Sequence, residues 1–361
     1  MKNVLITGGA GFIGSNFVRY LLKQEPAVQI INLDALTYAG SVENLKALPD
    51  QERHTFVHGN ICDRGLVDDL LGRHQIDTIV HFAAESHVDR SILGPEQFVQ
   101  TNVVGTFTLL EAARQLWLEE KSTAREAVRF HHVSTDEVFG ALTSEEPAWD
   151  ESTTYDPHSP YSATKAGSDH LVRAYHHTYR LPVTITNCSN NYGPYQFPEK
   201  LIPLMILNAL ESRPLPVYGD GGQIRDWLYV EDHCEAIWHV LHRGTLGETY
   251  NIGGGNQPTN LTVVRTLCKI LDERLPDSPN TPHKKLIQFV PDRPGHDRRY
   301  AMDITKINQE LGWQPRHSLE DGLLKTVEWY LSHLDWIDAI RKQHDFQGWL
   351  AINYTKRGEN S

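Results

Sequence analysis

Six short and almost continuously apolar runs, most of them separated by segments of helical length, constrain the fold of this chain more than any other feature. The runs are NVLIT (3–7), VQIINL (28–33), HTFVH (54–58), DTIVHFA (77–83), VRFHHVS (128–134) and PVTITNC (182–188). A strand that is apolar along its whole length is typical of a parallel sheet that helices cover on both faces. The pattern therefore predicts an α/β fold built on a Rossmann-type, doubly wound parallel sheet.

The pattern changes after about residue 190, where loops rich in Pro and Gly alternate with short strands and helices. Two such loops are NNYGPYQFPEK (190–200) and RPLPVYGDGGQIRDW (213–227). A chain of 361 residues is also longer than one average domain. We expect a Rossmann-type cofactor-binding domain over residues 1–190, which also receives about residues 226–256. A smaller carboxyl-terminal α/β domain over residues 191–361 would mainly bind the substrate.

Charge and hydropathy exclude several classes of partner. The net charge of −12 at pH 7 opposes non-specific binding to nucleic acid. No apolar run approaches the roughly 18 residues needed to cross a bilayer. The apolar stretch Val4–Ile6 is too short for the core of a signal peptide. We therefore expect a soluble, cytoplasmic protein that binds neither nucleic acid nor membrane.

Neither a disulfide framework nor a metal site is indicated. The four cysteines are Cys62, Cys188, Cys234 and Cys268. They lie far apart without a C-x-x-C motif, so we expect buried thiols. The histidine pairs at 131–132 and 176–177 are adjacent in sequence, whereas a helix presents two metal ligands on one face at a spacing of four residues. We expect no bound metal.

The segment VLITGGAGFIGS (4–15) has the features of a dinucleotide-binding turn. Gly8, Gly11 and Gly14 allow a tight turn, a close approach of backbone to a pyrophosphate, and close packing of a helix that begins near Phe12. Asp34 ends the second apolar run, where a carboxylate accepts hydrogen bonds from the adenosine ribose and repels a 2′-phosphate. The segment therefore predicts NAD as the cofactor. The alternative is a glycine-rich turn that binds nothing.

A second motif, YSATK, places Tyr161 and Lys165 one helical turn apart on one face. In that arrangement Lys165 can lower the pKa of the phenol and bond the nicotinamide ribose, so Tyr161 becomes a base for an alcohol proton. An isolated Y-x-x-x-K usually marks only a surface helix. Here it follows the glycine motif and a strand that ends at Ser134-Thr135, which is the order a dehydrogenase site requires. Thr135 would hydrogen-bond the reacting oxygen.

Two acids, Asp136 and Glu137, follow Thr135 directly. One interpretation is structural, because Ser134-x-x-Glu137 fits the capping-box pattern at the start of a short helix. The other is catalytic, since two carboxylic acids in different environments can act as an acid and a base. Oxidation of a hexose at C4 would acidify the C5 hydrogen. A base could then remove that proton while an acid expels the C6 hydroxyl as water, and the stored hydride could return to C6.

Motifs along nearly the whole chain resemble those of the dTDP-glucose 4,6-dehydratase family, which belongs to the extended short-chain dehydrogenases/reductases. The motifs are TGGAGFIGSNFV, LTYAG, HFAAESHVDRSI, STDEVFG, SPYSATKAGSDHLVRAY, SNNYGPYQFPEKLIP, YGDGGQIRDWLYVEDH and DRPGHDRRYAMD. The resemblance implies an NAD-dependent hydro-lyase of deoxysugar nucleotide biosynthesis that acts on dTDP-glucose. It implies Asp136 as the acid at the C6 oxygen, Glu137 as the base at C5 and Tyr161 as the base at C4. Thr135 and Lys165 would assist.

The resemblance also implies binding residues beyond those derived from the glycine turn. For NAD they are Phe12, Ile13, Asp34, Ala35, Leu36, Thr37, Asn60, Ile61, Phe82, Ala83, Ala84, Ser86, Thr101, Tyr161, Lys165 and Asn191. For the nucleotide-sugar they are Ser86, Thr135, Asp136, Glu137, Asn190, Lys200, Leu201, Pro216, Val217, Tyr218, Arg225, Asn260, Asp292, Arg293, Pro294, Gly295, His296 and Tyr354. Lys200, Arg225 and Arg293 would meet the diphosphate.

Assembly is the last expectation from the resemblance. The segment FVQTNVVGTFTLLEAARQLWL (98–118) and the helix expected over residues 161–180 resemble the pair through which this family dimerises. Their apolar positions exceed what one helical stripe against a sheet uses. We expect a homodimer with a four-helix seam.

Two other functions remain open from the sequence. A UDP-glucose 4-epimerase on the same fold needs Tyr, Lys and Ser/Thr but not the acid pair, so Asp136 and Glu137 distinguish the two activities. A non-catalytic NAD sensor or scaffold would keep the glycine turn and could lose the chemistry. Thr135, Tyr161 and Lys165 argue against that second alternative.

Overall fold

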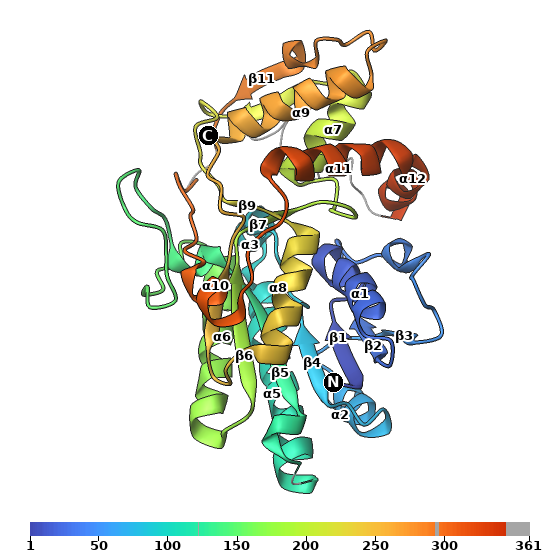
Figure 1. Ribbon diagram of the computed structural model, residues 1–361, viewed down its shortest axis with the longest axis vertical. Coiled ribbons are helices and arrows are strands. Elements are labelled where there is room, and N and C mark those ends of the chain that lie inside the picture. Colours follow the sequence, from blue (N-terminus) through green and yellow to red (C-terminus); the bar gives the residue numbers. More distant parts are fainter. Residues whose placement is uncertain (122, 293–295, 344–361) are drawn as a thin grey trace.

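A computed structural model describes residues 1–121, 123–292 and 296–343 of the chain. Its centre is a seven-stranded, fully parallel sheet in the order β10-β6-β5-β4-β1-β2-β3 (Figure 1). The strands are β1 (Asn3–Thr7), β2 (Gln29–Asp34), β3 (His54–His58), β4 (Thr78–His81), β5 (Arg129–Thr135), β6 (Val183–Cys188) and β10 (Thr249–Ile252). Each of the six apolar runs supplies one strand, and β10 falls in the returning segment 226–256. The predicted doubly wound parallel sheet is confirmed.

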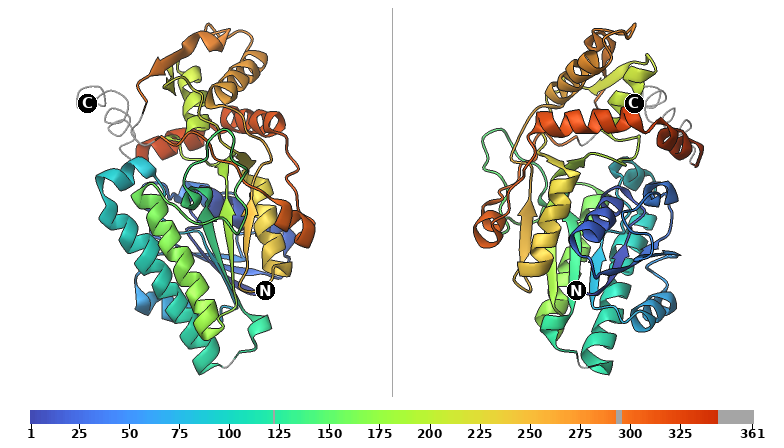
Figure 2. Two further views of the ribbon diagram at one scale, coloured as in Figure 1. Left: turned by 90° about the vertical axis from the view of Figure 1, so that its left-hand side faces the viewer. Right: turned by 45° about the vertical axis from the view of Figure 1, so that its right-hand side comes forward.

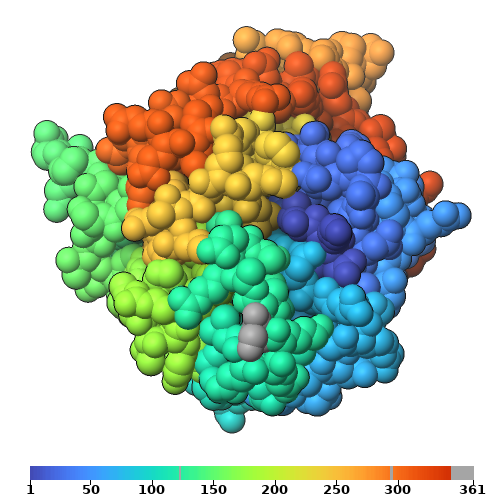
Figure 3. Space-filling view, turned by 60° about the horizontal axis from the view of Figure 1, so that its bottom comes forward, coloured from blue at the N-terminus to red at the C-terminus, as the bar shows by residue number. Residues whose placement is uncertain are grey.

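Helices cover both faces of the sheet because successive side chains of a strand point to opposite faces. Val4 and Ile6 of β1 pack into one cluster with α1 (Phe12–Gln24) and α8 (Val230–Arg243). Leu5, between them, packs into the cluster on the other face. That face is covered by α2 (Arg64–Arg73), α5 (Thr106–Arg114) and α6 (Pro160–Tyr179). Figure 3 shows α1 in blue beside α8 in yellow, although they are far apart in sequence.

One of the six runs is less buried than its sequence predicts. In β3 the five residues are half-buried or exposed, whereas every residue of β4 and β6 is buried. β3 is the last strand at one edge of the sheet and packs mainly against β2, whereas β10 at the other edge is buried because α10 packs on it. The expectation of burial on both faces is therefore wrong for residues 54–58.

Two helical runs stand beside α2 on the same side of the sheet (Figure 2, left). The first comprises α3 (Val88–Leu93), α4 (Pro95–Phe98), the π-helical η2 (Val99–Gly105), α5 and the π-helical η3 (Gln115–Glu120). The second is α6, whose start is fixed by a capping box between Ser159 and Ser162 with Pro160 at its first position. Tyr161 therefore lies in the first turn of α6, next to the end of β5.

A second layer lies beyond the carboxyl ends of the sheet strands, at the top of Figure 1. Its helices are α7 (Leu201–Leu210), α9 (Asn260–Arg274), α11 (Leu319–Ser332) and α12 (Leu334–Gln343), which share one hydrophobic core. Two small sheets pair β8 (Leu215–Tyr218) with β11 (Ile287–Val290) and β7 (Asn190–Tyr192) with β9 (Trp227–Tyr229). The remaining short elements are η1 (Val42–Leu45), η4 (Arg125–Ala127), η5 (Asp136–Phe139), η6 (His283–Leu286) and α10 (Thr305–Leu311).

Candidate active site

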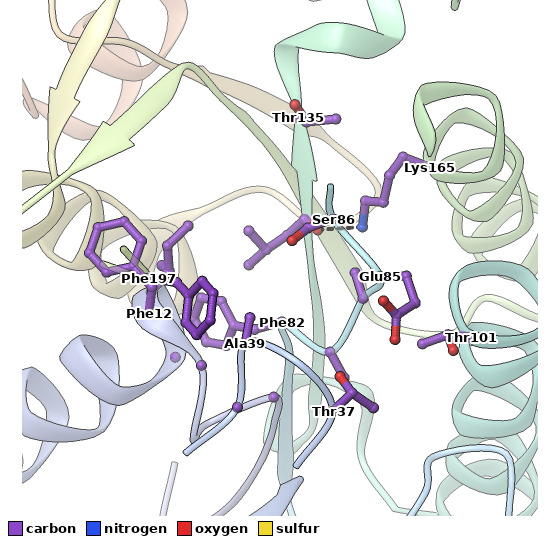
Figure 4. A pocket seen from close by; sticks show the side chains of 18 of the residues that line it. Phe12, Thr37, Ala39, Phe82, Glu85, Ser86, Thr101, Thr135, Lys165 and Phe197 are labelled. Atoms are coloured by element: carbon purple, nitrogen blue, oxygen red, sulfur yellow. Dashed lines mark hydrogen bonds between the residues drawn. The ribbon is translucent and has the colours of Figure 1, made fainter. Parts of the chain in front are cut away.

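A cavity opens at the carboxyl end of the sheet, where the strands end below the second layer. It brings together most of the residues predicted from the sequence (Figure 4). These are Gly8, Gly11, Phe12, Ile13, Gly14, Asp34, Ala35, Thr37, Asn60, Ile61, Phe82, Ala83, Ala84, Ser86, Thr101, Thr135, Asp136, Glu137, Tyr161, Lys165, Asn190, Asn191 and Lys200. In Figure 4, Phe12, Ala39, Phe82 and Phe197 gather on one side, and Lys165 points in from α6 on the other.

The glycine turn packs so tightly against neighbouring backbone that it has no space for side chains at two of its positions. A Cβ on Gly8, whose φ is +73°, would lie 2.6 Å from the backbone nitrogen of Ala83. A Cβ on Gly14 would lie 2.3 Å from the carbonyl oxygen of Gly8. Gly11 caps the start of α1 without a side-chain hydrogen bond. The first N–H groups of the helix can therefore donate hydrogen bonds to an anion. The turn fits the pyrophosphate of a dinucleotide.

Asp34 is held rigidly at the end of β2. Its Oδ2 accepts a hydrogen bond from the N–H of Ala10 at 2.9 Å, and its Oδ1 accepts one from the N–H of Leu36 at 2.8 Å. Burial raises the pKa of this carboxyl, and the two backbone hydrogen bonds oppose that effect. Leu36 itself does not line the cavity. Its backbone orients Asp34 toward the position that a ribose would take, which fits NAD.

Thr135, Tyr161 and Lys165 meet where β5 ends beside the first turns of α6. Lys165 is only 4% exposed, and its Nζ donates a hydrogen bond to the carbonyl oxygen of Val133 at 2.8 Å. The pKa of Tyr161 is raised well above its ordinary value, chiefly by burial and then by the charge of Glu137, while a hydrogen bond with Thr135 opposes the rise. Any effect of Lys165 on the pKa of Tyr161 is smaller than the effect of burial. The lowering of this pKa that the sequence predicts is therefore not seen.

Asp136 and Glu137 occupy different environments within η5. Asp136 is 1% exposed, and its Oδ2 has no hydrogen-bond partner among the described residues. Burial, and then the neighbouring Glu137, raise the pKa of Asp136 well above its ordinary value. Glu137 is half-buried at the cavity wall. An Asp136 whose protonated form is favoured, beside a more exposed Glu137, is the arrangement that an acid and a base need.

The capping interpretation of the acid pair is wrong in its detail. Thr135 is the cap of η5, since its Oγ1 accepts a hydrogen bond from the N–H of Glu137 at 3.3 Å. The hydroxyl of Ser134 instead donates to Asp169 Oδ2 at 2.8 Å. The predicted capping box between Ser134 and Glu137 is therefore absent, although both acids do lie in the first turn of η5.

Several predicted substrate residues lie outside this cavity. They are Leu201 in α7, Pro216, Val217 and Tyr218 in β8, Arg225, Asn260 at the start of α9, and Asp292 and His296 near the end of β11. Arg225 is buried, donates to the carbonyl oxygens of Ile224 and Asp297, and lies 4.1 Å over the ring of Tyr300. The predictions for Arg293, Pro294, Gly295 and Tyr354 fall outside the described residues.

The cavity also contains polar residues that the sequence analysis missed. They include Tyr38, Glu85, Gln97, Gln196 and Glu199. Tyr38 and Ser86 share a hydrogen bond of 3.2 Å between their hydroxyl oxygens, and the guanidinium of Arg90 lies 4.1 Å over the Tyr38 ring. One signal was available for Glu85, because a buried acid that follows a parallel strand so closely lies where such sheets bind ligands.

Cysteines, metal-ligating groups and membrane-spanning helices can also be assessed in the described residues. Cys188, Cys234 and Cys268 are buried and Cys62 is half-buried, and all four are free thiols. Across residues 1–121, 123–292 and 296–343, no three His, Cys, Asp or Glu side chains gather as metal ligands do. In the same part of the chain, none of the helices combines the length and the apolar character needed to span a membrane.

Comparison with known proteins identifies the family of the chain. The family model described as GDP-mannose 4,6 dehydratase matches residues 5–326. The chain is 53% identical to dTDP-glucose 4,6-dehydratase 1 of Escherichia coli (strain K12) over 362 residues, which covers 98% of this chain and 99% of the relative.

Two solved structures have the same fold. One is the dTDP-glucose 4,6-dehydratase of Bacillus anthracis in complex with NAD, with a TM-score of 0.83, 45% identity, and coverage of 94% of this chain and 100% of that one. The other is the UDP-glucose 4-epimerase of Thermotoga maritima with UDP-glucose, with a TM-score of 0.80, 29% identity, and coverage of 92% and 99%.

Proposed function

The chain belongs to the dTDP-glucose 4,6-dehydratase family, and we propose that its cavity carries out that reaction through the residue roles set out below. The reaction converts dTDP-glucose to dTDP-4-keto-6-deoxyglucose and water. It proceeds by oxidation at C4, elimination across C5 and C6, and return of the hydride to C6. The enzyme is an NAD-dependent hydro-lyase that ends each cycle with its cofactor unchanged.

The observation that carries this function is the acid pair beside Thr135. An epimerase needs a base for the alcohol proton and a hydride acceptor. Its reaction expels no hydroxyl, so it needs no acid to protonate a leaving group. Here Asp136 is buried, with one carboxyl oxygen that lacks a hydrogen-bond partner among the described residues, and burial and Glu137 raise its pKa, which favours its protonated form. Such a group can protonate the C6 oxygen as it leaves.

The other roles follow from position. Tyr161 takes the proton of the C4 hydroxyl while Thr135 hydrogen-bonds the same oxygen, and Glu137 removes the proton from C5. When bound, NAD supplies the site that accepts and returns the hydride, together with a positive ring that favours the phenolate of Tyr161. Lys165 would hold the nicotinamide ribose, and the turn at Gly8–Gly14 with Asp34 would hold the pyrophosphate and the adenosine ribose.

We assign NAD binding mainly to residues 1–190 with about 226–256, and nucleotide-sugar binding mainly to residues 191–361. Lys200 supports this division, since it belongs to the second part and yet reaches the cavity wall. Its ammonium group suits the diphosphate of the substrate. Arg225 would complete the diphosphate site when the second layer closes on the substrate.

We also propose that the enzyme is a homodimer. Large apolar side chains stay exposed on the two helical runs beside α2: Ile92 (58%), Leu93 (71%), Val99 (50%), Val104 (37%), Phe107 (46%) and Tyr179 (43%). The two runs lie side by side along the molecule in Figure 2 (left), so a second copy could pack its own pair against them as a four-helix seam.

A cytoplasmic location follows from the substrate and cofactor, which are made inside the cell.

One assay tests the function directly. The purified chain is supplied with dTDP-glucose and, in parallel, with UDP-glucose, and the products are identified by NMR. We expect a 4-keto-6-deoxy sugar from dTDP-glucose without net release of NADH. Epimerisation at C4 without loss of water would instead assign the chain to the epimerase activity.

A further inference from the structure

Beside Lys165 lies a group of buried polar side chains that the proposed mechanism does not use. It comprises His132 and Ser134 of β5, Asp169 of α6, and Asn187 of β6, together with the hydroxyl of Tyr155, and we call it the Asp169 cluster. The first four of these residues are almost completely buried, and Asp169 and His132 are both 0% exposed. Burying a carboxylate in this way is unfavourable unless it is paired and hydrogen-bonded.

Both oxygens of Asp169 have neighbours that favour its ionised form. Oδ2 accepts hydrogen bonds from the hydroxyls of Ser134 at 2.8 Å and Tyr155 at 2.9 Å. Oδ1 lies 3.1 Å from His132 Nε2. The pKa of Asp169 is lowered despite its burial, because His132, Lys165 and Ser134 stabilise the carboxylate.

Lys165 lies beside this cluster, close to both His132 and the charge of Asp169. Its Nζ lies 3.5 Å from His132 Nε2 and is fixed by the hydrogen bond to the Val133 carbonyl oxygen. Burial lowers the pKa of Lys165, and Asp169 is the strongest influence that raises it. Asp169 also lies four residues after Lys165 on α6, so the two side chains share one helical face.

The other titratable groups around Lys165 carry no compensating charge. His81 faces it from β4 and has a pKa well below its ordinary value, and the pKa of His132 on β5 is lowered to about 4, both mainly by burial. On β6, burial raises the pKa of Cys188 to about 12. Tyr161, on α6 itself, has a raised pKa. At neutral pH these four groups are therefore uncharged, and Asp169 is the anion that balances the ammonium group.

The same cluster also fixes the end of β5 that carries Thr135. Asn187 Nδ2 donates to the carbonyl oxygen of Thr135 at 3.1 Å and to the hydroxyl of Tyr155 at 3.2 Å. Tyr155 in turn donates to Asp169. The cluster therefore acts on both Lys165 and Thr135, on Lys165 through the charge of Asp169 and on Thr135 through the hydrogen bond from Asn187.

We propose that Asp169 is a positioning residue whose buried negative charge keeps Lys165 charged and holds its ammonium group against β5 at the cavity wall. This inference rests on the proposed function, in which Lys165 assists Tyr161 during oxidation at C4. Without the carboxylate, a buried ammonium group would face neutral side chains and lose its proton at a lower pH. Oxidation at C4 would then fail at a lower pH than in the wild-type enzyme.

The test isolates the hydride-transfer step with dTDP-6-deoxyglucose, which can be oxidised at C4 but has no C6 hydroxyl to lose. Reduction of bound NAD is followed by absorbance from about pH 6 to pH 10 in wild type and in Asp169→Asn. An amide at this position can still accept from Ser134 and Tyr155, so the main change is the loss of charge. We expect the alkaline midpoint of the rate to fall by about one pH unit or more, and NAD affinity, measured by calorimetry, to weaken over the same pH range.

Asp232→Asn is the matched control. Asp232 is also buried and also pairs with a histidine, with Oδ1 2.8 Å from His317 Nδ1, but it does not line the cavity. We expect this variant to lose stability while keeping the wild-type midpoint. An unchanged midpoint in Asp169→Asn, or an equal shift in both variants, would overturn the positioning role.

Tyr155→Phe is the second variant, for the case in which Asp169→Asn does not fold. It removes one of the two hydroxyl donors of Asp169 Oδ2 at a half-buried residue. We expect a smaller shift of the midpoint in the same direction, and no shift or an opposite shift contradicts the inference. If wild-type enzyme fails to convert dTDP-glucose, the proposed function is what fails.

Discussion

The hydroxyl of Thr135 donates a hydrogen bond to Asp136 Oδ1 at 3.3 Å, while Asp136 Oδ2 is buried with no hydrogen-bond partner among the described residues. The residue that would contact the reacting C4 oxygen therefore also orients the acid that would serve C6. A carboxyl group with one oxygen held and the other unpaired is ready to donate to a ligand. The oxidation and elimination halves of the reaction are thus joined at consecutive residues of β5 and η5.

The first prediction separates these two halves. Replacing Asp136 by Asn and Glu137 by Gln together keeps the shape of the site but removes its proton-transfer groups. Loss of water should slow by about 10²-fold to 10⁴-fold, while the first hydride transfer persists. Absorbance should show bound NADH that accumulates with dTDP-glucose, and NMR should show little 4-keto-6-deoxy product. Dehydration near the wild-type rate would leave the acid pair without a catalytic role.

The second prediction concerns pH. Because burial and Glu137 raise the pKa of Asp136, its acid form persists to higher pH than that of an ordinary Asp, and elimination should fail as the pH rises through that raised value. In the wild-type enzyme the steady-state fraction of bound NADH should therefore increase on the alkaline side. Below the alkaline limit of oxidation at C4, that fraction should be high and independent of pH in Asp136→Asn, because the group that titrates elimination is gone. A wild-type fraction that falls with rising pH would contradict this role.

Sequence patterns were sufficient to predict the sheet and to bring the glycine turn, Asp34 and Thr135 to one cavity, because each of these depends on local chemistry at a strand end. Gly8, Asp34 and Thr135 all lie at or just after the carboxyl end of a strand, so one topological rule places them in one cavity.

Properties that depend on long-range packing could not be obtained in this way. The exposure of β3 follows from its place at the sheet edge. The raised pKa of Tyr161 follows from burial, which no local motif specifies. Asp169 was visible in the sequence but could not be assigned, since its partners Ser134 and Tyr155 lie 35 and 14 residues away.

The third prediction tests the base at C4. In Tyr161→Phe the proton of the C4 hydroxyl has no acceptor, so the first hydride transfer should slow by about 10²-fold to 10⁴-fold and bound NADH should not accumulate. This outcome is the opposite of that expected for the acid-pair variant. In wild type, deuterium placed at C4 of dTDP-glucose should appear at C6 of the product, which mass spectrometry and NMR can locate. Deuterium lost to solvent would show that the hydride does not return.

The fourth prediction tests the glycine turn. In Gly14→Ala the new Cβ would lie 2.3 Å from the Gly8 carbonyl oxygen, a contact with backbone that cannot relax cheaply. We expect NAD affinity, measured by calorimetry, to fall by about a hundredfold or more. Gly72→Ala is the control, because a Cβ at Gly72 in α2 meets nothing within 4 Å. That variant should bind NAD as wild type does, and equal losses in both variants would remove the turn as the binding site.

The last prediction concerns assembly. Phe107 on α5 is 46% exposed beside other apolar side chains of the two helical runs, so Phe107→Asp would place a charge in the middle of the proposed seam. Light scattering at micromolar concentration should give the mass of a dimer for wild type and of a monomer for the variant. Phe289→Asp is the control, because Phe289 is 55% exposed but lies on β11 in the second layer. It should remain dimeric. A wild-type protein that is monomeric at these concentrations, or a dimer that survives the charge at Phe107, would exclude this seam.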